Sequence, residues 1–175
     1  MQGSSNIDNL RQKLLESGAV KFGDFTLTSG KKSTYYVDLK LASTNPSTLS
    51  LIAKEFSDLM PDNVDFIAGM ELGSIPLVTA LSLETGLPYA MIRKSNRSHG
   101  TGSRIEGPSK GRVVLVDDVA TTGGSNLESV KILTDAGAEV VKVLVVVDRE
   151  EGAAKNLSPL NLDYQSLVLI SDLVD

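Results

Sequence analysis

Five short apolar runs recur along the chain, separated by stretches with helical spacing, and this alternation constrains the fold more than any other feature. The runs lie at residues 64–68, 89–92, 113–116, 140–147 and 167–170. Helical patterns lie between them at residues 75–83 and 125–136. Runs that are apolar on both faces and rich in β-branched residues are typical of parallel strands buried between two helix layers. The sequence therefore predicts an α/β fold with a doubly wound, mainly parallel sheet flanked by helices.

The run at residues 140–147 is also compatible with a buried helix, because a short apolar run has no periodicity that distinguishes a helix from a strand. Valine occupies six of its eight positions, and β-branched side chains favour a strand. The chain has 175 residues and no segment that resembles a linker. A single core commonly organises about 100–200 residues, so we expect one domain over residues 1–175.

The first 45 residues follow a different pattern. Apolar residues between Ile7 and Leu15 recur at helical spacing, and Gly18 is placed to end that helix. Residues 22–39 alternate around a turn-forming segment, which predicts a hairpin. Asn45 is followed by a proline and opens a second helix. We therefore expect a small subdomain, the hood, at about residues 1–45.

Composition and charge exclude several classes of protein. The chain has no cysteine, which excludes a disulfide framework, a thiolate zinc site and a cysteine nucleophile. Its net charge of −5 is unfavourable for nucleic acid, and no apolar stretch approaches the roughly 20 residues of a membrane span. We expect no nucleic-acid or membrane partner and a cytoplasmic location. The charge is uneven, because residues 93–112 carry six Lys or Arg against one Glu, together with the only histidine, His99.

The stretch at residues 113–125 carries most of the chemical information. Ligands of such sheets lie beyond the carboxyl ends of the strands, and here a buried run delivers two adjacent carboxylates, Asp117 and Asp118, to that end. A small, hydroxyl-rich turn with Gly123 and Gly124 then leads into a helix. Backbone N–H groups at a helix start bind phosphate, and glycine lets the backbone approach it closely. The stretch therefore predicts a phosphate cradle.

Asp117 and Asp118 would repel a bare phosphate, so they need a ligand of their own. Ribose hydroxyls, or a Mg²⁺ ion carried by a diphosphate, would satisfy two carboxylates in that place. A molecule that carries a phosphate, a ribose and a metal-bound diphosphate in that order is a phosphoribosyl ligand. Taken alone, the Asp-Asp pair also fits a strand end whose second residue caps a helix.

Two other phosphate-binding motifs are not supported. Gly102 and Gly107 have the outer spacing of a Walker loop, but Pro108 stands where its lysine should be. Residues 100–102 begin like a dinucleotide-binding fingerprint, but no third glycine follows at the required position. The sequence therefore favours neither a nucleoside triphosphatase nor a Rossmann dehydrogenase.

Four separated segments together resemble one protein family. Residues 117–125 resemble the ribose-5-phosphate-binding signature of the type I phosphoribosyltransferases. Residues 22–36 are similar to the amino-terminal hood of the orotate members of that family, and residues 93–100 are similar to their mobile catalytic loop. Asp148 and Arg149 resemble their clamp for the substrate carboxylate. The resemblance extends from the hood to the clamp, with the motifs in the order of the family.

The resemblance implies transfer of a phosphoribosyl group from phosphoribosyl diphosphate to orotate, in pyrimidine biosynthesis, with orotidine 5′-monophosphate and diphosphate as products. It implies catalytic roles for Lys94, His99, Asp117 and Asp118. The residues implied to bind phosphoribosyl diphosphate are Arg93, Lys94, Arg97, His99, Asp117, Asp118, Val119, Ala120, Thr121, Thr122, Gly123, Gly124 and Ser125. Within this set, the two aspartates would hold ribose hydroxyls and the last five residues the 5-phosphate. Thr121 and Arg149 would contact orotate.

The resemblance also implies Mg²⁺ as a cofactor, carried by the diphosphate without a direct protein ligand. It implies a homodimer in which the mobile loop, at about residues 94–107, reaches into the site of the partner subunit. The longer bacterial members have lysine at three positions where this chain has Thr28, Gly73 and Arg97. The first two changes remove cations that grip the ligand, whereas arginine keeps the charge but replaces a point cation with a planar fork.

Two alternatives remain open at this point. The Asp-Asp signature is shared across the class, so another base, such as xanthine or uracil, is possible, although the hood and Arg149 favour orotate. The second alternative is a non-catalytic, nucleotide-sensing regulator on the same fold. Such a regulator would need a module that binds nucleic acid, and only about twenty residues precede the hood hairpin.

Overall fold

The computed structural model describes residues 2–26, 32–95 and 103–174. Within these ranges, six strands form one sheet in the order β5-β4-β3-β6-β7-β8. They are β3 (Phe66–Met70), β4 (Tyr89–Ile92), β5 (Ile105–Glu106), β6 (Gly111–Ala120), β7 (Ala138–Asp148) and β8 (Asp163–Leu169). Neighbouring strands run parallel except β5, which is antiparallel to β4. The predicted α/β fold with a mainly parallel sheet is therefore confirmed.

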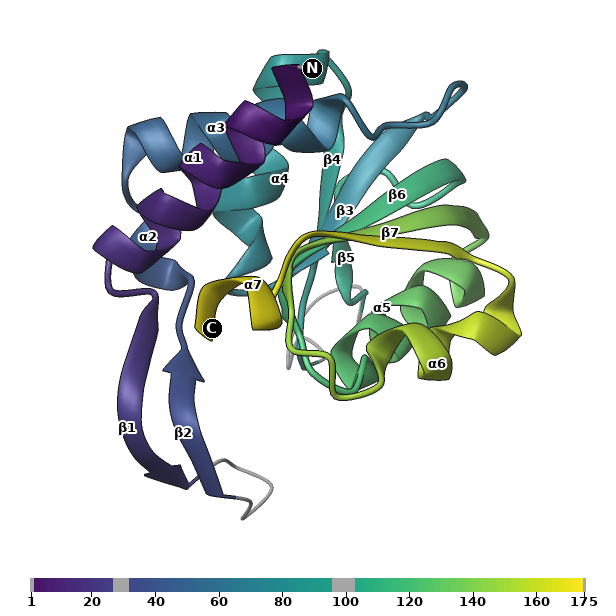
Figure 1. Ribbon diagram of the computed structural model, residues 1–175. Coiled ribbons are helices and arrows are strands. Elements are labelled where there is room, and N and C mark those ends of the chain that lie inside the picture. Colours follow the sequence, from purple (N-terminus) through teal and green to yellow (C-terminus); the bar gives the residue numbers. More distant parts are fainter. Residues whose placement is uncertain (1, 27–31, 96–102, 175) are drawn as a thin grey trace.

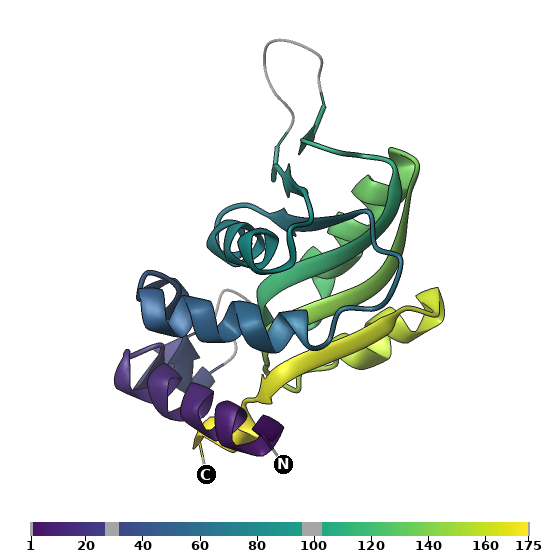
Figure 2. The ribbon, with the colours of Figure 1, turned by 90° about the horizontal axis from the view of Figure 1, so that it is seen from above.

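Helices cover both faces of the sheet (Figure 1). They are α1 (Gln2–Glu16), α2 (Lys40–Ser43), α3 (Pro46–Ser57), α4 (Ser74–Thr85), α5 (Gly124–Asp135), α6 (Ala153–Leu157), the short 3₁₀ helix η1 (Ser158–Leu160) and α7 (Ser171–Val174). α3 and α4 lie on one side, and α5 and α6 on the other. α1 packs outside this arrangement, because Figure 2 shows α3 between α1 and α4. None of the helices in the described ranges is long and apolar enough to cross a membrane.

Each face of the sheet has its own layer of buried side chains. Val114 lies in one layer with Leu77 of α4, and Val113 lies in the other with Leu133 of α5. The two valines separate because successive strand residues point to opposite faces. Leu10 of α1 belongs to the first layer, so the amino-terminal helix shares the core of the sheet. Burial of a leucine of this kind stabilises the fold by about 1.5–3 kcal/mol.

The helix boundaries near the amino terminus follow from the residues predicted to set them. Asn45 caps α3, because its side chain accepts hydrogen bonds from the backbone N–H groups of Ser47 and Thr48, and Pro46 occupies the first turn. Gly18, just after α1, adopts φ of +71°, a conformation that L-residues with a side chain rarely adopt. Both predicted signals are confirmed.

The predicted hairpin is also confirmed. β1 (Val20–Thr26) pairs with β2 (Lys32–Val37) in antiparallel register, with Val20 opposite Val37. The hairpin extends away from the six-stranded sheet (Figure 1), and Phe22 on it is 63% exposed. Residues 27–31, which hold most of the predicted turn and Thr28, lie outside the described residues.

The strands differ from the prediction mainly at their ends. β6 continues four residues past its predicted end at Val116, because the long strand β7 pairs with Asp117, Val119 and Ala120. β3 begins at Phe66, two residues later than predicted, and β8 begins at Asp163, four residues earlier. β5 was assigned to the mobile loop, but its two residues pair with β4. A two-residue strand is too short to show a period in the sequence.

Candidate active site

Asp117 and Asp118 lie inside β6, which corrects the prediction that they follow the strand. Adjacent strand residues point to opposite sides, so the two side chains contact different neighbours, although both carboxylates line one pocket at the end of the strand. Asp117 accepts a hydrogen bond of 2.9 Å from Nδ2 of Asn126, a buried residue of α5. Asp118 lies against Gly73, where an added Cβ would overlap with its carboxylate. The two carboxylates therefore have different environments and are not interchangeable.

The environment of Asp117 changes its proton affinity. Burial, and next the negative charge of Asp118, raise the pKa of Asp117 to about 7. The hydrogen bond from Asn126 favours the ionised form and offsets part of this effect. Near neutral pH, Asp117 can thus donate a hydrogen bond to a ligand hydroxyl or accept one from it.

A pocket of about 220 Å³ lies at the start of α5. Apart from Val119, its lining consists of small polar and glycine residues: Thr121, Thr122, Gly123, Gly124, Ser125 and Asn126. Gly123 precedes the helix with φ of +79° and packs against Ala153, so a side chain there would be both strained and crowded. No side chain caps this helix start. Its first N–H groups therefore face the pocket together with the hydroxyls, which makes it suitable for a phosphate.

A second pocket of about 190 Å³ adjoins the first, since Val119 and Ser125 line both. It is lined by Asp117 and Asp118, by Met70 at the end of β3 with residues 71–73 after it, and by two lysines, Lys40 and Lys94. Carboxylates and cations thus meet beside the phosphate cradle. Such a pocket can hold a ribose at the carboxylates and an anionic group at the lysines.

Two neighbouring residues of the basic stretch at residues 93–112 have different surroundings. Nε of Arg93 forms an ion pair of 3.0 Å with Glu106 on β5. Lys94 instead lines the pocket that contains Asp117 and Asp118 of its own chain. The resemblance groups Lys94 with a loop that serves the partner subunit, whereas within this chain Lys94 lies beside residues 71–73 and the two aspartates. Arg97 and His99 lie outside the described residues, within 96–102.

Arg149 lies directly after β7 and is buried rather than exposed, with 8% of its side chain accessible. Its guanidinium stacks over the ring of Tyr35 from the hood, 5.2 Å from the ring centroid. Nη2 pairs with Glu151 at 2.8 Å, and its backbone N–H donates to the carbonyl of Ala120. Nε is buried and has no hydrogen-bond partner among the described residues. Arg149 therefore offers an N–H donor to an anionic group beside an aromatic ring.

The comparisons with known proteins agree with this geometry. Residues 49–163 match the family model described as a phosphoribosyl transferase domain. The chain is 51% identical to the orotate phosphoribosyltransferase of Pyrococcus abyssi, over 96% of this chain and 95% of that protein. The chain belongs to the orotate phosphoribosyltransferase family.

Solved structures of the family have the same architecture. The orotate phosphoribosyltransferase of Aeropyrum pernix superposes with a TM-score of 0.85 at 34% identity, over 94% of this chain and 96% of that one. The enzyme of Mycobacterium tuberculosis H37Rv in complex with 5-phospho-alpha-D-ribosyl 1-diphosphate gives a TM-score of 0.79 at 33% identity. That match covers 96% of this chain and 98% of the other.

Of Thr28 and Gly73, where the longer bacterial members have lysine, only Gly73 lies among the described residues. At Gly73 a lysine would require the carboxylate of Asp118 to move, because its Cβ would overlap with that side chain. Lys40, which the sequence analysis missed, supplies a cation to the same pocket from α2. Its ion pair of 2.9 Å with Asp38 raises the pKa of Lys40 and keeps it charged. The sequence offered one signal for this residue, because Asp38 and Lys40 stand two positions apart directly after the hairpin and can form an ion pair.

Mg²⁺ prefers oxygen ligands, and the carboxylates of this site are ligands of that kind. Among the described residues, no group of three or more His, Cys, Asp or Glu side chains is arranged to hold a metal ion. Mg²⁺ commonly keeps several waters and binds one or two carboxylates together with substrate phosphates. Asp118 beside the lysines in the second pocket is a donor of that type.

Proposed function

We propose that this family member transfers the 5-phosphoribosyl group of phosphoribosyl diphosphate to orotate, releasing diphosphate and forming orotidine 5′-monophosphate for pyrimidine biosynthesis. The observation that carries the proposal is the pair of adjoining pockets, one built for phosphate and one that combines carboxylates with lysines. Membership of the orotate phosphoribosyltransferase family supports orotate as the base. We place the reaction in the cytoplasm.

The first pocket holds the 5-phosphate and the second holds the ribose and the diphosphate. The helix dipole and the N–H groups of α5 favour the phosphate charge. Asp117 and Asp118 accept hydrogen bonds from the ribose hydroxyls. Lys40 and Lys94 lie where the diphosphate leaves C1 of the ribose. This arrangement fixes C1 between the leaving group and the incoming base.

The reaction moves charge from the sugar to the leaving group. The bond between ribose C1 and the diphosphate oxygen breaks, and the oxygen keeps the electron pair. A ring nitrogen of orotate gives its electron pair to C1 and forms the new bond, and the proton of that N–H passes to the departing diphosphate. Lys40 and Lys94 stabilise the departing negative charge, which lowers the barrier because the charge is larger in the transition state. Mg²⁺ on the diphosphate, when bound, adds positive charge to the same leaving group.

Arg149 and Thr121 bind orotate in this proposal. The carboxylate of orotate accepts hydrogen bonds from the guanidinium, whose Nε has no other acceptor among the described residues. Tyr35 of the hood supplies an aromatic surface next to that carboxylate. Uracil has no carboxylate, so it leaves the buried Nε of Arg149 without an acceptor among the described residues. The site therefore discriminates against uracil.

The test of the proposed function is a panel of bases with one enzyme preparation. Orotate, uracil and xanthine are each incubated with phosphoribosyl diphosphate and Mg²⁺, and the nucleotide product is measured by chromatography. We expect orotidine 5′-monophosphate with orotate, and no comparable product with the other two bases. Conversion of uracil or xanthine without conversion of orotate would assign the chain to another base. Binding of nucleotides without any turnover would favour a non-catalytic regulator.

We also propose that the chain acts as a homodimer in which His99 and Arg97 serve the site of the partner subunit. The test mixes a His99→Ala chain with an Asp117→Asn chain, because each homodimer lacks one part of every site. Random pairing gives about half mixed dimers with one complete site each, so activity returns to about a quarter of wild type. Lys94→Ala mixed with Asp117→Asn is the matched control. It restores nothing, because both residues belong to the same chain's site.

A further inference from the structure

Arg104 lies beside β4 and β5 at the edge of the sheet, close to Arg93 and Lys94. Its Nε donates to the backbone carbonyl of Arg93 at 2.8 Å. Its Nη2 donates to the carbonyl of Lys94 and to a carboxylate oxygen of Glu128, each at 2.7 Å. In return, the N–H of Arg93 donates to the carbonyl of Arg104 at 2.8 Å. The planar guanidinium of Arg104 thus connects the backbone of Arg93 and Lys94 to Glu128 on α5.

These contacts fix the backbone of Lys94 from two sides. Its carbonyl accepts from Arg104, and its N–H donates to Oε1 of Glu71 at 2.9 Å. Glu71 belongs to the segment after β3 that lines the pocket of the two carboxylates. The peptide groups on both sides of Lys94 are therefore held by side chains, which leaves its own side chain aimed at the pocket it lines.

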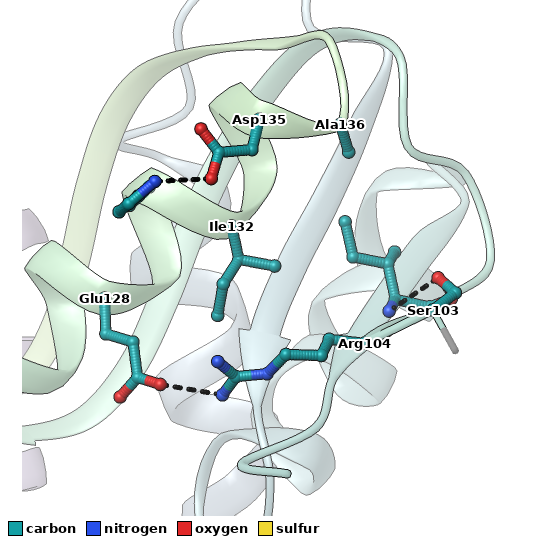
Figure 3. Close-up of a pocket in the computed structure, with 8 residues that line it drawn as sticks. Ser103, Arg104, Glu128, Ile132, Asp135 and Ala136 are labelled. Atoms are coloured by element: carbon teal, nitrogen blue, oxygen red, sulfur yellow. Dashed lines mark hydrogen bonds and ion pairs between the residues drawn. The ribbon is translucent and has the colours of Figure 1, made fainter. Parts of the chain in front are cut away.

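Glu128 connects the same guanidinium to the phosphate cradle. It lies on α5 four residues after Gly124, the residue that begins the helix at the cradle. Figure 3 shows Arg104 reaching across to Glu128 on α5. The cavity at this place has a volume of about 460 Å³ and shares no lining residue with the two reaction pockets. Arg104 therefore acts at a distance from the substrate.

We propose that Arg104 is a positioning residue that holds Lys94 in place for the diphosphate and ties it to the helix of the phosphate cradle. This inference rests on the proposed function, since it assigns a role within that reaction. Lysine in place of Arg104 would not suffice, because an ammonium group lacks the planar fork that reaches three acceptors. Arg104 works through Lys94, so its effect requires Lys94 to be present.

The experiment compares Arg104→Gln with a matched control, Arg112→Gln. Nε of Arg112 also donates to a backbone carbonyl, that of Asn63, and its Nη1 also pairs with a glutamate, Glu139, both at 3.0 Å. Arg112 is the second residue of β6, far along the strand from its two aspartates. We expect Arg104→Gln to lower kcat/KM for phosphoribosyl diphosphate by about 10- to 100-fold, as misplacement of a reacting group does. Arg112→Gln should leave it unchanged.

A double-mutant cycle separates positioning from a general structural role. In a Lys94→Ala background, Arg104→Gln should lower kcat/KM by less than about twofold, because the residue it positions is already gone. An equal loss in both backgrounds would overturn the proposal, and so would wild-type kcat/KM in Arg104→Gln. Should Arg104→Gln fail to fold, Glu128→Ala removes one of the three contacts and should give a smaller loss that also vanishes without Lys94.

Failure of this inference and failure of the proposed function give different results. If the wild-type chain converts no base, the proposed function fails. The cycle is then measured as the affinity for phosphoribosyl diphosphate with Mg²⁺ by calorimetry. Arg104→Gln should weaken that affinity only when Lys94 is present, and equal weakening in both backgrounds would refute the positioning role.

Discussion

Replacement of Asp117 by asparagine should stabilise the fold at neutral and alkaline pH. Burial and the charge of Asp118 raise the pKa of Asp117 from 3.8 to about 7. Each unit of pKa corresponds to about 1.4 kcal/mol, so the folded chain disfavours the ionised form by roughly 4 kcal/mol. Asparagine carries no charge and can still accept the hydrogen bond of Asn126. The variant therefore removes this cost.

The sign of the pH dependence follows from proton uptake on folding. Between the two pKa values, the folded chain keeps a proton on Asp117 that the unfolded chain has lost. The contribution of Asp117 to the free energy of unfolding therefore falls as pH rises from about 4 to about 7, and stays constant above that. The gain from Asp117→Asn should be near zero at about pH 4 and reach roughly 4 kcal/mol at about pH 8.

The assay is urea unfolding of wild type and variant across this pH range at one protein concentration, because association would otherwise change the apparent stability. For a chain of this size, roughly 4 kcal/mol corresponds to a rise in Tm of about 8–16 °C. Asp135→Asn is the control, because Asp135 is exposed on α5 and pairs only with Lys131 among the described residues. A gain that does not depend on pH, or a less stable Asp117→Asn at about pH 8, would refute this reasoning.

Three further substitutions test the site. Asp117→Asn combined with Asp118→Asn should abolish turnover and leave the fold intact, as measured by orotate conversion beside circular dichroism; wild-type activity would exclude the ribose-holding role. Arg149→Lys should weaken orotate by about 1–3 kcal/mol, because lysine lacks the two-donor fork; calorimetry would contradict this if phosphoribosyl diphosphate were weakened equally. Lys40→Ala should raise KM for phosphoribosyl diphosphate about tenfold, as loss of a charge-assisted hydrogen bond does. Lys131→Ala, which also removes a lysine paired with an aspartate, should leave KM unchanged.

The parts of the fold that the sequence predicted are those determined by neighbouring residues. The apolar run that includes Val113 and Val114 predicted β6, and the cap at Asn45 predicted the start of α3. The cradle was predicted because small and glycine residues such as Gly123 act locally, through backbone geometry. Each of these signals lies within one segment, so it can be read without knowing the fold.

The remaining features depend on residues that are distant in the sequence. The extension of β6 through Asp118 depends on the length of β7, which the run after Val113 does not show. Lys40 reaches the site only because the segment after the hairpin returns to the sheet beside Gly73. Arg104 contacts Glu128, which is 24 residues away. From the sequence alone, charged side chains of this kind are interpreted as solvated, because only the fold shows their partners.

We propose that this chain transfers a phosphoribosyl group to orotate rather than only binding or hydrolysing phosphoribosyl diphosphate. The most direct measurement is a ³¹P NMR time course of the enzyme with phosphoribosyl diphosphate, Mg²⁺ and orotate. We expect the substrate signals to be replaced by equal amounts of diphosphate and orotidine 5′-monophosphate, with no change when orotate is omitted. Diphosphate released without an equal amount of nucleotide, or substrate signals that do not change in the presence of orotate, would contradict the claim.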